Sequence, residues 1–137
     1  MTPSRMDPIV FDLYDGAYGP TLRIDVHTTP QALVVNETLR RLASKPGVKI
    51  PVHESDSYSL SGVELVSLES TEAEPVGSRI QRPQSATLQW AMGQDEWRRC
   101  LALAEHLFDL ERPGHQYLTT QGRDDVVVEL AYRESRG

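Results

Sequence analysis

Apolar and polar residues alternate in two early segments of the chain, 9–14 and 21–27. Alternation with a period of two places successive side chains on opposite faces of a strand, so both segments are predicted to be half-buried β-strands. The residues between them, Asp15 to Pro20, include two glycines and end in proline, which favours a hairpin loop of more than two residues. We therefore expect the two strands to be antiparallel neighbours.

Helical spacing follows the second of these strands. Thr28 lies three residues before Gln31, the spacing of a capping box, and Pro30 falls in the first turn, where its missing N–H costs little. Apolar residues then recur at steps of three and four as far as Leu42, and Pro46 ends the run. The pattern predicts one amphipathic helix.

A second and clearer helical pattern begins after Gly93 and ends at Arg112 to Gly114. Its apolar residues form one stripe that should pack on a sheet: Trp97, Cys100, Leu101, Ala104, Leu107 and Phe108. Cys100 is the only cysteine, so an internal disulfide is excluded. Its place on the stripe predicts a buried, inert thiol rather than a nucleophile.

Shorter strand patterns occupy the remaining chain, at 48–52, 58–70, 86–92 and 125–134. Pro51 suggests an edge position for the first of these, because proline cannot donate to a ladder. The order β-β-α-β-β-β-α-β predicts an α+β fold, with a mixed or mainly antiparallel sheet of about five to six strands and two helices packed on one face. We expect a single domain, 1–137, with a flexible amino terminus at 1–7 and a mobile acidic, proline-containing loop at 70–85.

Negative charge is concentrated in one stretch, 54–74, which we call the acidic segment. It contains no Lys or Arg, and its acids are Glu54, Asp56, Glu64, Glu69, Glu72 and Glu74. These charges equal the whole formal excess of -6. A local negative field steers a basic partner, whereas evenly spread charge mainly aids solubility. The first hypothesis is therefore a small protein-interaction module, an inhibitor or regulator, that binds a basic protein.

The overall composition excludes several classes of function. A net negative chain is a poor match for nucleic acid, whose phosphates require clustered Lys and Arg. No stretch approaches the roughly 20 apolar residues that cross a bilayer, and the amino terminus has no apolar run, so we expect a cytoplasmic protein without a membrane partner. No nucleophile, phosphate-binding or metal-ligand motif is present, and we predict no catalytic residue, metal site or cofactor, which favours a non-enzyme.

A second hypothesis uses the polar face of the strands. Asp12, Asp25, His27 and Glu129 would converge there if their strands were neighbours, and His115 lies in a turn near Tyr117. Carboxylates beside an imidazole can perform acid–base chemistry or bind a divalent metal, as in a small enzyme or ligand-binding protein. The alternative, which the pattern favours, is a solvated face with cross-strand Arg–Asp pairs.

A third hypothesis is a homo-oligomer. Its copies would associate through the edge strand that contains Pro51 or through an exposed face of the second helix.

Overall fold

The structure is a computed structural model, and it describes residues 7–17, 19–72, 77–81, 87–118 and 126–134. The elements in this part of the chain are β1 Ile9–Gly16, β2 Gly19–Val26, α1 Thr29–Ser44, β3 Lys49–Pro51, the 3₁₀-helix η1 Val52–Glu54, β4 Tyr58–Ser61, β5 Leu65–Thr71, β6 Gly77–Gln81, β7 Thr87–Gly93, α2 Gln94–Asp109, β8 Gly114–Tyr117 and β9 Val127–Tyr132. The predicted α+β class is confirmed.

The strands form two mixed sheets rather than the single sheet that the pattern predicts. The first sheet has the order β4-β1-β2-β9-β8, with β1 and β2 antiparallel and β2 and β9 parallel. The second has the order β3-β5-β7-β6, with β5 and β7 parallel and the two outer strands antiparallel to their neighbours. β3, which contains Pro51, is an edge strand as expected.

The split into two sheets occurs inside the segment 58–70, which the sequence predicts to be one strand. Gly62 has a φ of 76°, in the region that favours glycine, and a side chain at this position would overlap the carbonyl oxygen of Leu13 in β1. The chain therefore pairs with β1 as β4, turns sharply at Gly62, and continues as β5 in the second sheet. Alternation alone could not reveal this break.

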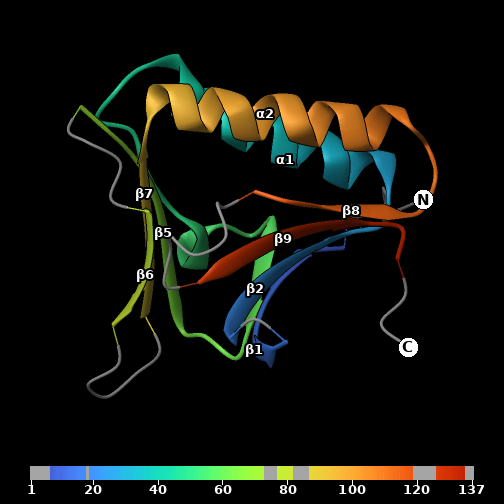
Figure 1. The fold of residues 1–137 in the computed structure, drawn as a ribbon, viewed down its shortest axis with the longest axis horizontal. Coiled ribbons are helices and arrows are strands. Elements are labelled where there is room, and N and C mark those ends of the chain that lie inside the picture. Colours follow the sequence, from blue (N-terminus) through green and yellow to red (C-terminus); the bar gives the residue numbers. More distant parts are fainter. Residues whose placement is uncertain (1–6, 18, 73–76, 82–86, 119–125, 135–137) are drawn as a thin grey trace, which may run out of the picture.

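Both helices lie on the same side of the first sheet, and the second sheet stands upright beside them (Figure 1). Alternate residues of β1, β2 and β9 are buried in the shared core: Ile9, Phe11, Leu13, Leu22, Ile24, Val26, Val128, Leu130 and Tyr132. Trp90 of β7 packs on Trp97 of α2, with ring centroids 4.6 Å apart, which joins the second sheet to the helices. Cys100 is buried in the same core, as expected.

The start of α1 has the capping box that the sequence predicts. The Thr28 side chain accepts a hydrogen bond from the N–H of Gln31, and the Gln31 side chain accepts one from the N–H of Thr28. Where the sequence predicts a mobile loop at 70–85, the structure has the end of β5 and strand β6. Residues 73–76 and 82–85 of that range, and 1–6 of the amino terminus, lie outside the described residues.

Candidate functional site

The acidic segment follows η1, β4 and β5. Four of its acids are exposed and form no ion pair with a described residue: Glu54, Asp56, Glu64 and Glu72. Glu69 is half-buried on the outer face of the second sheet, where it accepts a hydrogen bond from Gln89 at 3.4 Å and lies opposite Lys49 in the register. Glu74 lies outside the described residues.

These acids do not form one tight cluster, because two of them lie at opposite ends of β5. Glu64 precedes β5 and Glu72 follows it. An extended strand advances about 3.3 Å per residue, so the two backbones are roughly 25 Å apart. The acidic segment therefore presents separated negative charges, in η1, before β4 and at the two ends of β5, which suits an extended contact better than a single bound ion.

One face of the first sheet brings together three acids of the second hypothesis. In the register Asp12 of β1 lies opposite Arg23 of β2, and Arg23 lies opposite Glu129 of β9. Asp25 is two residues further along β2, so its side chain lies on the same face. Asp12, Asp25 and Glu129 are all buried, although the helices pack on the other face of this sheet.

Arg23 organises this polar face. Its Nε donates to Oδ1 of Asp25 at 2.6 Å and its Nη1 donates to Oε1 of Glu129 at 3.0 Å. The three side chains are only 11%, 8% and 10% exposed, respectively. Hydrogen-bonded charges in such a site are mutually dependent, because removing one partner leaves the other charge buried. The Arg23–Asp25 pair lies within β2, and the pair that crosses between strands is Arg23–Glu129, so the expected cross-strand pairing is made with a glutamate. The face is also buried at these residues rather than solvated as the pattern predicts.

The guanidinium of Arg23 has more acidic neighbours than one ion pair requires. Glu134, which follows β9, lies 4.0 Å from it. Burial alone lowers the pKa of Arg23. The hydrogen bond to Asp25 and the surrounding carboxylates raise it, and the net shift of the Arg23 pKa is upward. The arginine therefore stays charged and holds the carboxylates in place.

The two histidines of the second hypothesis occupy different places. His27 follows the last paired residue of β2, is exposed, and donates its backbone N–H to Gln31 at 2.7 Å. His115 of β8 lies at the edge of the polar face, with Nδ1 3.1 Å from Oε2 of Glu134. The structure thus places His115 beside the acidic cluster and His27 at the cap of α1.

Neither a metal centre nor a membrane span emerges in the described part of the chain. Among those residues, no three or more His, Cys, Asp or Glu side chains are grouped so that they could hold a metal ion. No described helix is long and apolar enough to cross a bilayer.

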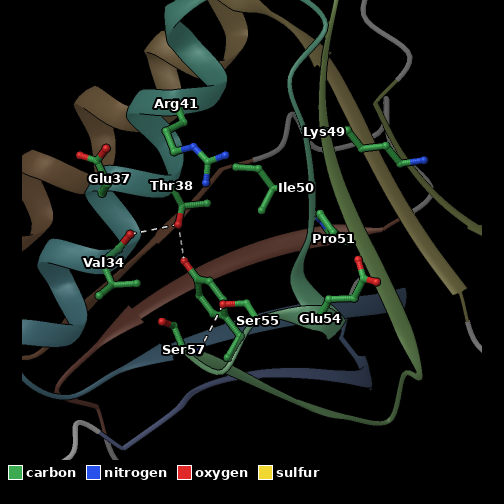
Figure 2. Close-up of a pocket in the computed structure, with 11 residues that line it drawn as sticks. Val34, Glu37, Thr38, Arg41, Lys49, Ile50, Pro51, Glu54, Ser55 and Ser57 are labelled. Carbon is green, nitrogen blue, oxygen red and sulfur yellow. Dashed lines mark hydrogen bonds between the residues drawn. The ribbon is translucent and has the colours of Figure 1, made fainter.

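A pocket of about 420 Å³ lies between α1 on one side and β3, η1 and the start of β4 on the other (Figure 2). Val34, Ile50 and Pro51 supply apolar lining, and serine, threonine and tyrosine hydroxyls supply polar lining. Arg41 and Ile50 reach toward each other from α1 and β3, whereas Lys49 points away beyond β3 (Figure 2). Because Glu54 also lines the pocket, the pocket adjoins the start of the acidic segment.

The floor of this pocket contains a short hydrogen bond between Thr38 and Tyr58, with 2.6 Å between the two hydroxyl oxygens. Thr38 also donates to the carbonyl of Val34 at 3.0 Å. Burial raises the pKa of Tyr58, and the hydrogen bond with Thr38 lowers it by less, so the net shift is upward from 10.0. Tyr58 is therefore neutral at physiological pH.

The sequence did not reveal this pocket, because three separate segments form it. Arg41 is one of two adjacent arginines on α1, and such charges more often form a solvated face than a binding site. One usable signal is present: Val34, Thr38 and Arg41 follow steps of four and three along α1. They form a mixed stripe beside the apolar one, which is typical of a helix face at the border of a core.

Comparisons of the chain with protein-family models, with curated proteins and with solved structures give no match, so its function is argued from its own residues.

Proposed function

We propose that the protein is a small cytoplasmic interaction module, an inhibitor or regulator, that binds a basic protein through the acidic segment. The observation that carries the proposal is the set of exposed carboxylates of Glu54, Asp56, Glu64 and Glu72, which have no ion-pair partner among the described residues. Charges that are not neutralised within the chain remain available to a partner. Neither a nucleic acid nor an anionic membrane surface matches this charge.

The outer face of the second sheet supports the proposal. Both helices and the first sheet lie on the other side of this sheet, and no described element covers its outer face (Figure 1). Leu65 at the start of β5 is 41% exposed, and Gln89 of β7 is exposed on the same face. Glu64 immediately precedes Leu65, so an exposed apolar side chain lies next to one of the unpaired acids along the chain, and such a contact offers both area and charge complementarity.

Partner capture from native lysate tests this function. The bait is compared with a neutralised variant in which Glu54, Asp56, Glu64 and Glu72 become the corresponding amides. A matched control neutralises four exposed acids elsewhere: Asp7, Asp15, Glu105 and Asp109. Both variants change the net charge equally, so only the place of the charge differs.

We expect a basic protein on the wild-type and control baits, lost from the neutralised bait and reduced by raising salt from roughly 50 to 300 mM. Retention of that protein on the neutralised bait would exclude the acidic segment as its binding surface. Self-association, the homo-oligomer hypothesis, would instead give a solution mass above that of one chain.

A second candidate is a small enzyme or ligand-binding protein that uses the polar face of the first sheet. The observation that favours it is the convergence of Asp12, Asp25 and Glu129 around Arg23, with His115 at the margin. Because the described residues include no group of metal ligands, this candidate is tested as a ligand site, by unfolding temperatures measured with a panel of small organic anions and cations. A rise that His115→Ala abolishes would support it, and unchanged temperatures would remove it.

A further inference from the structure

Four charged residues line the pocket, of which Glu37 pairs with Arg40 and Lys49 points away beyond β3, whereas Arg41 and Glu54 lie on opposite walls without pairing to each other. Arg41 extends from α1 on one wall and Glu54 lies in η1 on the other (Figure 2). Both side chains are exposed, and neither forms an ion pair with a described residue. A molecule that carries a carboxylate at one end and an ammonium group at the other could pair with both charges at once.

The hydroxyls that line the same pocket can donate hydrogen bonds to the carboxylate of such a molecule and accept them from its ammonium group. A threonine hydroxyl has one proton, and the proton of Thr38 goes to the carbonyl of Val34. Tyr58 therefore donates in the 2.6 Å contact with Thr38, and its own oxygen keeps its lone pairs as acceptors. Ser55 accepts from the N–H of Ser57 at 3.2 Å and retains its proton as a donor. Donors and acceptors are both present.

The walls of the pocket are fixed by packing on either side. The bond between Thr38 and Tyr58 joins α1 to β4, and Tyr58 also packs edge-on against Phe11 of β1, with ring centroids 5.1 Å apart. Ile50 on the opposite wall belongs to the core. Pockets that bind small molecules typically have about 300–1,000 Å³, apolar walls and a few convergent polar groups. The volume of about 420 Å³ and the lining fit that range.

We propose that this pocket binds a small zwitterion of the amino-acid or dipeptide class, with its carboxylate at Arg41 and its ammonium group at Glu54. The hydroxyls of Ser55 and Tyr58 contribute hydrogen bonds between the two ends, and the side chain of the ligand lies on Ile50 and Pro51. This ligand site shares Glu54 with the acidic segment, but the proposed docking of a basic protein also uses Asp56, Glu64 and Glu72 and needs no small molecule.

The test is a binding measurement with ligands that differ only in charge. The full chain, labelled with ¹⁵N, is titrated with the dipeptide alanyl-leucine, with its carboxamide, which lacks the carboxylate, and with its N-acetyl form, which lacks the ammonium group. The twenty free L-amino acids form a second panel. We expect a zwitterion to bind with a Kd below about 1 mM and each charge-deleted analogue to bind at least about tenfold more weakly, since one charged hydrogen bond accounts for roughly that factor.

Variants locate the site. Arg41→Gln and Glu54→Gln are each expected to weaken binding about tenfold, because each removes one charged contact. Arg98→Gln and Glu105→Gln make the same chemical changes at exposed positions of α2 and should leave the affinity unchanged. All four positions are exposed, so each variant is expected to fold, which its amide spectrum verifies.

The amide spectrum also reports where a ligand binds. Shifts confined to 34–41 and 49–58 are expected. The proposal is overturned by the absence of binding for every zwitterion, by equal affinities for the charge-deleted analogues, or by shifts that gather on the polar face of the first sheet. Arg41→Gln weakens zwitterion binding without changing the acidic segment and should leave protein capture unaffected, so the two proposals fail separately.

Discussion

Nε of Arg23 lies 2.6 Å from Oδ1 of Asp25, on the face of the first sheet that points away from both helices. The same guanidinium bonds Glu129 on the neighbouring strand. One cation thus ties β2 to β9 and fixes two carboxylates whose side chains are nearly buried. The stability of the first sheet should therefore depend on this arginine.

Replacing the guanidinium by an apolar side chain of similar length should be strongly destabilising. Arg23→Met leaves Asp25 and Glu129 buried without their cation, a change that typically costs about 3–5 kcal/mol. Urea unfolding of the wild type and the variant measures the loss. Arg98→Met removes an ion pair with Asp95 whose side chains are 60% and 95% exposed, and should cost under about 1 kcal/mol. Equal effects at the two sites would contradict the role assigned to the buried cluster.

The turn that divides the two sheets should not tolerate a side chain. Gly62 and Gly47 have similar φ values, 76° and 83°, but only at Gly62 would a Cβ overlap a backbone atom, the carbonyl oxygen of Leu13. Alanine at Gly47 should cost about 1–2 kcal/mol from backbone strain alone. Alanine at Gly62 should cost more, since β1 or β4 must also move. The denaturation midpoints of the two alanine variants measure these losses of stability. Equal losses at Gly62 and Gly47 would contradict the prediction, because they would mean that β1 and β4 separate at little cost.

Tyr58 should make folding sensitive to alkaline pH. Burial raises its pKa in the folded chain above the value of about 10 that an unfolded tyrosine has. The folded chain therefore holds the Tyr58 proton more tightly than the unfolded chain does. The contribution of this proton to the free energy of unfolding is fully present below pH 10 and is lost as the pH rises through the pKa of the folded chain. The free energy of unfolding, measured from pH 8 to pH 11, should fall less steeply for Tyr58→Phe. Identical slopes would contradict a raised pKa.

The cap of α1 offers a test of a feature visible in the sequence. The buried side chain of Gln31 accepts from the backbone N–H groups of His27 and Thr28, and its Nε2 donates to the carbonyl of Asp7 at 2.9 Å. Gln31→Ala removes all three bonds and should cost roughly 2–3 kcal/mol. Thr28→Ala removes one capping bond and should cost about 1 kcal/mol. Thermal unfolding measures the loss of stability in both variants. A larger loss for Thr28→Ala than for Gln31→Ala would contradict the three hydrogen bonds assigned to Gln31.

Local patterns in the sequence predict local structure in this chain. The capping spacing of Thr28 and Gln31 marks the start of α1, and the alternation in β1, β2 and β9 predicts which side chains enter the core. The same alternation places Asp12, Asp25 and Glu129 on one face, because side-chain direction depends only on the period of the strand.

Relations between distant segments are not contained in these patterns. The parallel pairing of β2 with β9 brings Glu129 to Arg23 across 106 residues, and no local period encodes that register. The division into two sheets depends on one close backbone approach at Gly62. The pocket needs α1, β3 and β4 together, so no local pattern marks Arg41 as one of its residues.

The most direct measurement of the proposed docking is the association rate constant of a captured basic protein, measured in about 50 mM salt for the wild type, the neutralised variant and the matched control. Exposed charge accelerates encounter more than it slows dissociation. We predict that the variant lacking the charges of Glu54, Asp56, Glu64 and Glu72 associates at least about tenfold more slowly, while the control stays within about twofold of the wild type. Equal rate constants for the two variants would contradict docking through the acidic segment.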